Sequence, residues 1–204
     1  MEITKIVVTG GPCGGKSTAL DCIRTEFMKQ GYTVLTVAET ATEMISGGVT
    51  PWGCNSPVAY QYAHIPLQLA KELAYRRGAE RMPAEKVLIV CDRALYDSRA
   101  YIPDEDFYAI LAHYDLDPEA ILKSYDAVFH LVTAAKGAEA FYTTANNTAH
   151  TETVAEAAAL DDSSMRAWSG HPHHYIIDNS TDFAGKMDRL IRAIGAFLDS
   201  KRGA

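Results

Sequence analysis

The segment that most constrains this chain is a glycine-rich stretch near the amino terminus, Gly10-Gly-Pro-Cys-Gly-Gly-Lys-Ser17. An Ile/Val-rich run, predicted as a strand over Lys5–Thr9, precedes it, and a helix-length segment from Ser17 to about Gln30 follows. The spacing Gly-x-x-x-x-Gly-Lys-Ser between a strand and a helix is typical of a P-loop, which binds nucleotide phosphates. A glycine-rich turn without a ligand is the alternative, but the complete motif and its flanks favour the P-loop.

The residue types of this loop suit a phosphate chain. Glycines let the backbone approach the phosphates with its N–H groups turned inward, and the positive end of the following helix points at the same place. Lys16 is predicted to neutralise the β- and γ-phosphate oxygens of ATP, and Ser17 to bind Mg²⁺. The loop residues predicted to contact the nucleotide are Gly11, Pro12, Cys13, Gly14, Gly15, Lys16, Ser17 and Thr18.

Composition limits the class of protein and of partner. The 204 residues suit a single α/β domain over 1–204. A net charge of −7, without any Lys/Arg-rich run, argues against a nucleic-acid partner. No apolar run is as long as the roughly 18 residues of a membrane span. The four cysteines show no C-x-x-C spacing, which indicates reduced thiols in a cytoplasm.

Two further predicted strands deliver charged residues at their ends. Glu39 follows the run Thr33–Ala38, and Asp92-Arg93 follows the apolar run Lys86–Cys91. In an open α/β sheet, ligands bind at the carboxyl ends of the strands. We therefore predict that Asp92 holds Mg²⁺ and that Arg93 bridges phosphates with its planar guanidinium group. A structural ion pair is the alternative for Asp92 and also for Asp97, a few residues further on.

Residues of about 40–80 are predicted to form the acceptor side of the site. A breaker-rich loop over 46–57 leads into a helix with Pro57 in its first turn and Asn55 or Ser56 as its cap. Gln61 lies off the apolar stripe of this helix and is predicted to face a ligand. The stripe, which predicts the buried face, consists of Val58, Tyr62, Ile65, Leu69 and Leu73.

The rest of the chain continues the alternation of strands and helices. Helical segments over about 103–116 and 118–124 precede a fourth strand, Ala127–Thr133, and a fifth strand, His174–Asp178, precedes a last helix from Asp182. The pattern predicts a parallel, doubly wound sheet with right-handed crossovers. The polar section of about 136–170 contains a helix near Glu152–Leu160. It is predicted to be a lid that closes over the phosphates and excludes water.

Several segments outside the P-loop together resemble a known family. They are Ala38-Glu-Thr-Ala-Thr-Glu43, Cys91-Asp-Arg93 with Asp97, Tyr125–Ala135, Trp168-x-Gly-His-Pro-His173 and Ile177-Asp-Asn-x-x-Asp-Phe183. With the P-loop, they look like the AAA-type P-loop domain shared by NadR and the TRPL translocation defect protein. The resemblance covers nearly the whole chain. It implies a kinase-like three-layer sandwich whose five-stranded parallel sheet has the order 2-3-1-4-5.

The resemblance also implies roles for particular residues. Asp92 would lie next to Ser17 and Mg²⁺, whereas Glu39, from the outer strand, would lie on the acceptor side. Asn179 and Asp182 would flank the nucleotide base, although a helix cap by Asn179 or Ser180 fits equally well.

The family leads us to expect a lid arginine near His150. Between Ala145 and His171 the only arginine is Arg166, which is therefore predicted to stabilise charge on the transferring phosphoryl group.

Together these features predict an ATP-dependent, Mg²⁺-dependent phosphotransferase that acts on a small, nucleoside-like hydroxyl acceptor. Glu39 would orient or deprotonate that hydroxyl. The predicted catalytic residues are Lys16, Glu39, Asp92, Arg93 and Arg166, and the predicted acceptor pocket contains Glu39, Trp52, Gln61 and Asp97.

Other interpretations stay open at this point. The family includes regulators, so a switch that binds ATP or GTP and hydrolyses it slowly is the main alternative. The base-reading Asn-Lys-x-Asp motif is absent, which argues against a dedicated GTPase but leaves GTP binding open. A metal site at His171, His173 and His174 with His150 is a weaker alternative, because Pro172 and the short spacing suit a loop. The oligomeric state, including a homodimer, is not readable from the sequence.

Overall fold

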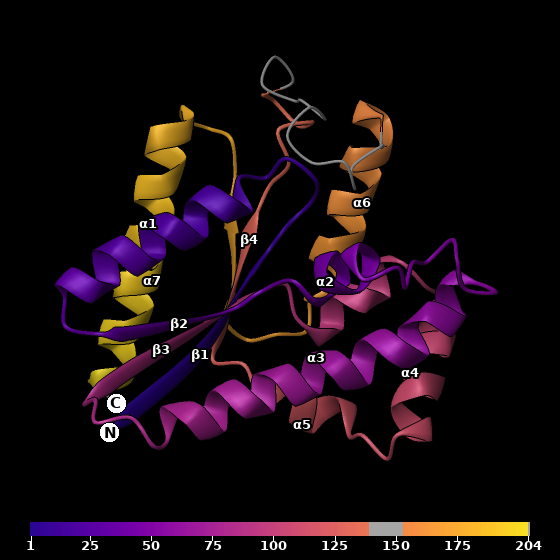
Figure 1. Ribbon diagram of the computed structural model, residues 1–204. Helices are drawn as coiled ribbons and strands as arrows, with labels where there is room; N and C mark the ends of the chain where they lie inside the picture. Colours follow the sequence, from indigo (N-terminus) through magenta and orange to yellow (C-terminus); the bar gives the residue numbers. More distant parts are fainter. Residues whose placement is uncertain (139–152, 204) are drawn as a thin grey trace.

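A single parallel sheet organises the fold. The computed structural model describes residues 1–138 and 153–203, and within these ranges five parallel strands pair in the order β2-β3-β1-β4-β5 (Figure 1). The strand order is the one that the family resemblance implied, so the predicted kinase-like P-loop fold is confirmed. The strands are β1 (Glu2–Thr9), β2 (Thr33–Val37), β3 (Lys86–Asp92), β4 (Ala127–Leu131) and β5 (His174–Ile177).

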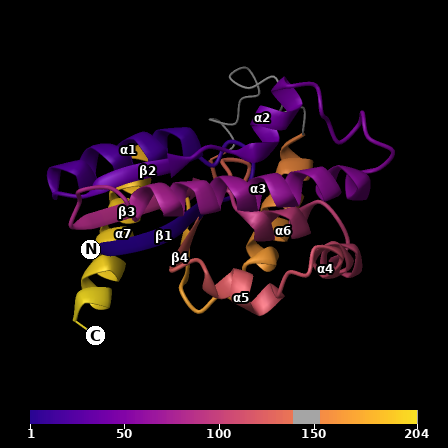
Figure 2. The same ribbon diagram turned by 60° about the horizontal axis from the view of Figure 1, so that its bottom comes forward.

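Helices cover both faces of the sheet, which is why its central strands are apolar on both sides. Successive residues of β1 point to opposite faces, so Ile6 and Val8 join one buried cluster while Val7 joins the other. Helices α1 (Lys16–Lys29) and α7 (Phe183–Arg202) pack on the first face. The second face carries α3 (Pro57–Ala79), α4 (Asp104–His113) and α5 (Pro118–Lys123) (Figure 2).

The long helix α3 buries a face that overlaps the predicted stripe only in part. Tyr62 and Leu73 of the expected stripe are 37% and 48% exposed, so the prediction is wrong for these two residues. The buried face carries polar side chains, because partners elsewhere in the fold satisfy them: Gln68 Nε2 donates to Glu72 Oε1 at 2.8 Å, and Lys5 pairs with Glu72 at 2.8 Å. The residues of the expected stripe that do contact the core are Val58, Ile65 and Leu69.

Two short elements near the predicted acceptor side have no counterpart in the sequence pattern. Helix α2 (Thr40–Ser46) starts directly after Glu39, and a 3₁₀ helix, η1 (Leu95–Ala100), starts shortly after Arg93. Seven and six residues are too few to show a helical period, which explains why they were missed. Both elements turn the chain immediately after a charged residue and so fix the place of its side chain.

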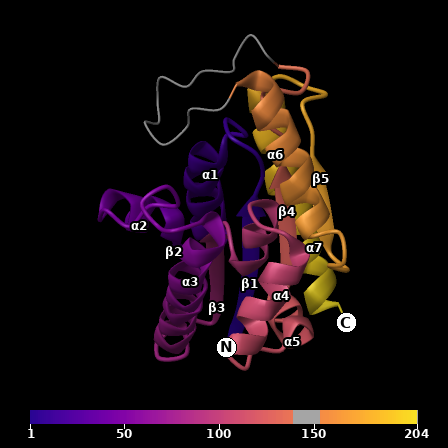
Figure 3. The same cartoon turned by 90° about the vertical axis from the view of Figure 1, so that its right-hand side faces the viewer.

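Helix α6 (Val154–Ala167) is longer than the predicted helix of Glu152–Leu160 and is built into the body of the molecule. Figure 3 shows it standing beside β4 and β5, and Trp168 at its end is fully buried. The described part of the predicted lid, 136–170, is therefore attached to the core. The lid stays a prediction for residues 139–152, which lie outside the described residues.

Side chains cap two of the helices that border the site. Ser56 Oγ accepts the Ala59 N–H at 3.0 Å at the start of α3, which confirms one of the two predicted caps. At the start of α7 the cap is Asp182, whose Oδ1 accepts the Gly185 N–H at 2.9 Å. Neither Asn179 nor Ser180 takes that position. Across the described ranges, the helices all fall short of the length and apolarity that a bilayer crossing demands.

Candidate functional site

The P-loop connects β1 to α1, and its glycines are required by close packing. Gly10 has a φ of 138°, and a Cβ there would lie 2.1 Å from the Leu131 carbonyl oxygen. Gly15 has a φ of 90°, and a Cβ there would lie 2.6 Å from the Phe183 ring. At both positions any other residue would have an unfavourable backbone conformation and a Cβ that clashes with a neighbouring group, so glycine is required. The loop is thus held between β4 and the start of α7, and the amino terminus of α1 faces the predicted phosphate position.

Lys16 is the cation of this loop. Its Nζ contacts the backbone oxygens of Gly10 and Gly11 at 3.5 Å and 3.3 Å. Burial and the neighbouring Arg93 guanidinium lower the pKa of Lys16 to about 8, and nearby carboxylates, Glu39 foremost, partly offset them. Because its charge is met by long contacts to carbonyl groups, Lys16 can exchange them for phosphate oxygens.

Asp92 and Ser17 lie at the same edge of the sheet. Strands β1 and β3 are adjacent, and Val8 pairs with Asp92, so this carboxylate ends beside the start of the P-loop. Within the described residues, Asp92 Oδ1 is buried and has no hydrogen-bond partner, and burial raises the pKa of Asp92. The Ser17 residue is exposed at the start of α1. A carboxylate oxygen without a hydrogen-bond partner and the hydroxyl of an exposed serine fit Mg²⁺, which prefers oxygen ligands.

Arg93, Glu39 and Asp97 form a charged cluster between the P-loop and the acceptor side. Arg93 Nε donates to Glu39 Oε1 at 2.7 Å, and its Nη1 lies 3.5 Å from Asp97 Oδ1. Arg93 has a φ of 59°, which is rare for a residue other than glycine. Burial would raise the pKa of Glu39, but Arg93, Lys16 and a hydrogen bond from Thr42 hold that pKa at about 2. Glu39 is therefore a carboxylate at any physiological pH.

A pocket of about 310 Å³ opens onto this cluster. Its walls come from α2, the loop after α2, α3, the end of β3 and η1, and Glu39 and Arg93 form part of its polar side. Gln61 lines it and is only 4% exposed, and no described residue donates a hydrogen bond to its Oε1. Trp52 lies at the rim and is 73% exposed. Further ring-bearing residues of the lining are Tyr60, His64 and Tyr101.

The structure therefore brings together most of the side chains predicted for the acceptor pocket. Asp97 lines it too, but its Oδ1 accepts a hydrogen bond from the Thr9 hydroxyl and its Oδ2 accepts the Ala94 N–H at 2.9 Å. Asp97 thus holds η1 and β1 together in addition to facing the pocket. Burial lowers the pKa of His64 to about 4, so this lining residue is neutral at pH 7.

A comparison with family models agrees with this arrangement. A model described as an AAA domain matches residues 5–186, which is most of the chain. The chain belongs to this AAA domain family. No curated protein matches it. P-loop AAA domains bind nucleotide together with Mg²⁺, so this chain is a nucleotide-binding P-loop protein.

In this AAA domain, the two residues predicted to flank the base are engaged by the protein itself. Asn179 Nδ2 donates to the backbone oxygens of Thr133 and Lys136 at 2.8 Å and 2.7 Å, and its Oδ1 accepts from Lys186 Nζ at 2.8 Å. Asp182 caps α7. The structure thus gives both residues bracing roles, and their contact with a nucleotide stays a prediction.

The side-chain hydrogen bond described for Arg166 lies within its own helix. Arg166 lies exposed near the end of α6, and its Nη2 donates to Ser163 Oγ at 2.8 Å on the same helix. The predicted role of Arg166 in stabilising transferred charge has no support from these contacts. Arg93, which is buried beside Lys16, is better placed for it.

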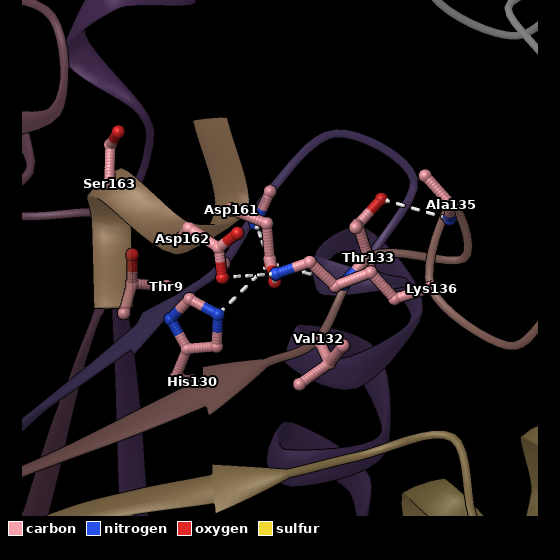
Figure 4. A network of polar contacts seen from close by, with 12 residues as sticks. Thr9, His130, Val132, Thr133, Ala135, Lys136, Asp161, Asp162 and Ser163 are labelled. Atoms are coloured by element: carbon pink, nitrogen blue, oxygen red, sulfur yellow. Dashed lines mark hydrogen bonds and ion pairs between the residues drawn. The ribbon is translucent and has the colours of Figure 1, made fainter. Parts of the chain in front are cut away.

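Sequence reasoning missed a buried polar network behind the AAA domain's P-loop, centred on Asp161 of α6 (Figure 4). Asp161 Oδ1 accepts the Gly11 N–H at 2.8 Å, and His130 Nε2 donates to the same oxygen at 3.0 Å. A signal was present, because an acid stands among uncharged residues that recur at helical spacing. The residues of that spacing are Ala157, Asp161, Ser164 and Trp168, all buried.

A second missed residue, Lys186 of α7, also contacts the loop from behind. Its Nζ donates to the backbone oxygens of Gly14 at 3.2 Å and Val132 at 2.6 Å. Burial lowers the pKa of Lys186 to about 8. Lys186 therefore ties α7 and β4 to the P-loop.

The histidines of the alternative metal site make other contacts. His171 Nε2 donates to the Tyr125 carbonyl oxygen at 2.9 Å, and His171 Nδ1 accepts the His173 N–H at 3.1 Å. Within residues 1–138 and 153–203, no three His, Cys, Asp or Glu side chains group as metal ligands would. His150 lies outside the described residues. The three described histidines therefore give no support to the alternative metal site.

Proposed function

We propose that this AAA domain is an Mg²⁺-dependent phosphotransferase that moves the γ-phosphoryl group of ATP to a hydroxyl group of a small, nucleoside-like acceptor. The observation that carries the proposal is the shared charged cluster. Glu39 and Arg93 line the 310 Å³ pocket and at the same time act electrostatically on Lys16 of the P-loop. A nucleotide phosphate and an acceptor would therefore meet at this cluster.

The size and lining of the pocket favour a small molecule as acceptor. Ligand pockets begin at about 300 Å³, so the volume of this pocket suits a small molecule. The exposed ring of Trp52 offers a face for a planar ring, and Gln61 Oε1 offers an acceptor for an N–H or O–H group. The carboxylate of Glu39 suits a sugar hydroxyl.

The chain's own residues supply the rest of the proposed mechanism. The loop backbone and Lys16 hold the β- and γ-phosphates, and Arg93 meets the charge on the transferring group. Glu39 accepts a hydrogen bond from the acceptor hydroxyl and orients its oxygen toward the γ-phosphorus. The new O–P bond forms as the bond to the leaving ADP oxygen breaks, and the hydroxyl proton passes to Glu39 or to water.

Ser17 and Asp92 would hold Mg²⁺ in this scheme. When bound, the cation neutralises charge on the phosphate oxygens. The orphaned Asp92 Oδ1 and the raised pKa of Asp92 support this assignment, since both indicate a carboxylate without its counter-charge.

The proposal follows the kinase branch of the family that the sequence resembles, in which NadR's domain phosphorylates ribosylnicotinamide. A cytoplasmic location belongs to the same proposal. Cys22, Cys54 and Cys91 are free thiols, which supports a reducing compartment.

Transfer from γ-labelled ATP tests the proposal directly. The purified chain is incubated with Mg²⁺ and a panel of nucleosides and ribosides that includes nicotinamide riboside, with Lys16→Ala as the blank. The expected result is a labelled product that depends on Lys16 and on Mg²⁺. Tight binding of ATP or GTP without a labelled product from any acceptor would contradict the proposal and favour the nucleotide-dependent switch.

A further inference from the structure

The buried network behind the P-loop has a feature that the proposed reaction does not use. The Asp161 carboxylate belongs to α6, yet it binds the backbone of the P-loop, some 150 positions earlier in the chain (Figure 4). It is fully buried, and a charge in such a place is costly unless it is paired.

Four donors satisfy this carboxylate. Oδ1 accepts the N–H groups of Gly11 at 2.8 Å and Thr133 at 3.1 Å together with His130 Nε2 at 3.0 Å. Oδ2 accepts from Lys136 Nζ at 2.9 Å. Burial would raise the pKa of Asp161, but the hydrogen bonds from His130 and Lys136 hold that pKa well below its usual range. Asp161 is thus a permanent anion, placed against a loop that binds anions.

The contact with Gly11 fixes a particular peptide plane. In a trans peptide the C=O and N–H groups point in opposite directions, and the described residues contain no cis peptide. The Gly11 N–H points to Asp161, and the Gly10 C=O of the same peptide points to Lys16 Nζ, at 3.5 Å. A flipped peptide would turn the carbonyl oxygen toward the Asp161 carboxylate and the N–H toward the Lys16 ammonium. Both contacts would be repulsive, so the flip is disfavoured at each end.

The side chain of Asp161 also lies too close to the loop for anything but glycine. A Cβ at Gly11 would lie 2.7 Å from Asp161 Cβ and 3.1 Å from Thr133 Cβ. Thr133 adds a second link, because its hydroxyl donates to the Pro12 carbonyl oxygen. The part of the loop that carries the acceptors of Lys16 is therefore clamped from α6 and from the residues after β4.

We infer that Asp161 is a positioning residue for nucleotide binding, which acts through the Gly10–Gly11 peptide to hold Lys16 where a phosphate chain can meet it. The inference rests on the proposed function only in that the P-loop binds a nucleotide. It does not depend on the acceptor. Without Asp161 the peptide can turn, and Lys16 loses its fixed position before the nucleotide arrives.

Calorimetric titration of the whole chain with Mg²⁺–ATP, without an acceptor, tests the inference. Asp161→Ala removes the anchor, and Asp161→Asn keeps one oxygen that can accept the Gly11 N–H. We expect the Kd to rise about tenfold or more in Asp161→Ala and less in Asp161→Asn. Asp162→Asn is the matched control, because Asp162 also pairs with Lys136, at 2.6 Å, but its side chain is 57% exposed. Its Kd should equal that of the wild type.

Thermal unfolding of each variant without nucleotide separates positioning from stability. A purely structural role would lower the Tm of Asp161→Ala and leave its Kd, measured well below that Tm, unchanged. This result would overturn the inference. If Asp161→Ala does not fold, Asp161→Asn decides, and a wild-type Kd in that folded variant would also overturn it. If the wild-type protein binds neither Mg²⁺–ATP nor Mg²⁺–GTP, both the proposed function and this inference are contradicted. An unchanged Kd in the Asp161 variants contradicts the inference alone.

Discussion

Glu39 and Arg93 follow neighbouring strands, β2 and β3, and their side chains form an ion pair of 2.7 Å between Oε1 and Nε. Arg93 is almost fully buried, whereas the Glu39 side chain is 24% exposed and faces the pocket. The pair therefore fixes the direction of a carboxylate that would otherwise be free to rotate. Under the proposed function, this fixed carboxylate accepts a hydrogen bond from the acceptor hydroxyl.

Replacing Glu39 should affect phosphoryl transfer much more than nucleotide binding. Because Glu39 lies on the predicted acceptor side and its pKa is held at about 2, its proposed role is to orient the hydroxyl, and Glu39→Gln is expected to lower kcat by roughly 10²-fold or more. Glu43→Gln is the matched control, because Glu43 is 62% exposed and pairs with Lys71. Steady-state transfer and Mg²⁺–ATP titration check the prediction. Unchanged turnover in Glu39→Gln would remove this residue from the mechanism.

Nucleotide affinity should depend on pH through Lys16. The pKa of Lys16 in the nucleotide-free protein is about 8, and a bound phosphate chain favours the protonated form. The affinity for nucleotide should therefore be highest at pH values well below 8, where Lys16 is protonated. It should fall as the pH rises through 8, by up to about tenfold per pH unit. Titrations between about pH 6.5 and 9.5 measure this. In Lys16→Arg the side chain stays charged, so the alkaline fall should disappear. A fall of equal size in that variant would assign it to another group.

Asp92→Asn should stabilise the nucleotide-free protein while impairing Mg²⁺-dependent activity. Burial raises the pKa of Asp92, so its charge is unfavourable in the empty site and the uncharged amide of Asp92→Asn removes that cost. For a chain of this size the gain corresponds to a rise in Tm of roughly 2–4 °C per kcal/mol. Scanning calorimetry without Mg²⁺ measures it. Asp188→Asn, an exposed position on α7, should not change the Tm. A lower Tm in Asp92→Asn would mean that its carboxylate has a partner in the empty protein.

Two glutamines on the same face of α3 should behave differently. Gln61 Oε1 has no partner in the described structure, so Gln61→Leu should change the Tm little. If Gln61 binds the acceptor, the same variant should raise the KM for the acceptor by about 5- to 150-fold, the equivalent of about 1–3 kcal/mol. Gln68 bonds to both Thr40 and Glu72, so Gln68→Leu should lower the stability by about 1–3 kcal/mol. Acceptor kinetics and thermal unfolding of both variants measure this. The same KM for wild type and Gln61→Leu would place the acceptor elsewhere.

The fold could be predicted because its signals are local and its topology is shared by a family. The apolar runs of β3 and β4 and the strand–loop–helix context of Lys16 are visible within short windows. Strand order was not readable from such windows, and it followed from the family resemblance alone.

The buried face of α3 could not be predicted in the same way. Glu72 is buried because Lys5 and Tyr125 bond to it, and these partners are distant in sequence. A helical pattern shows which residues share a face, but not that a distant lysine will make a glutamate acceptable in the core. For Asp161 the helical spacing indicated a buried position, but its contacts could not be predicted, because its partners Gly11 and His130 come from other elements.

The pocket has two walls of different origin. Glu39 and Arg93 stand at the ends of sheet strands, whereas Ile45, Pro51 and Trp52 belong to α2 and the loop that follows it. Mutations in this second wall can change which molecule fits without moving the charged groups beside Lys16. Under the proposed function, such an arrangement would let a lineage change its preferred acceptor through a surface segment, while selection on phosphate chemistry would act on the residues at the strand ends.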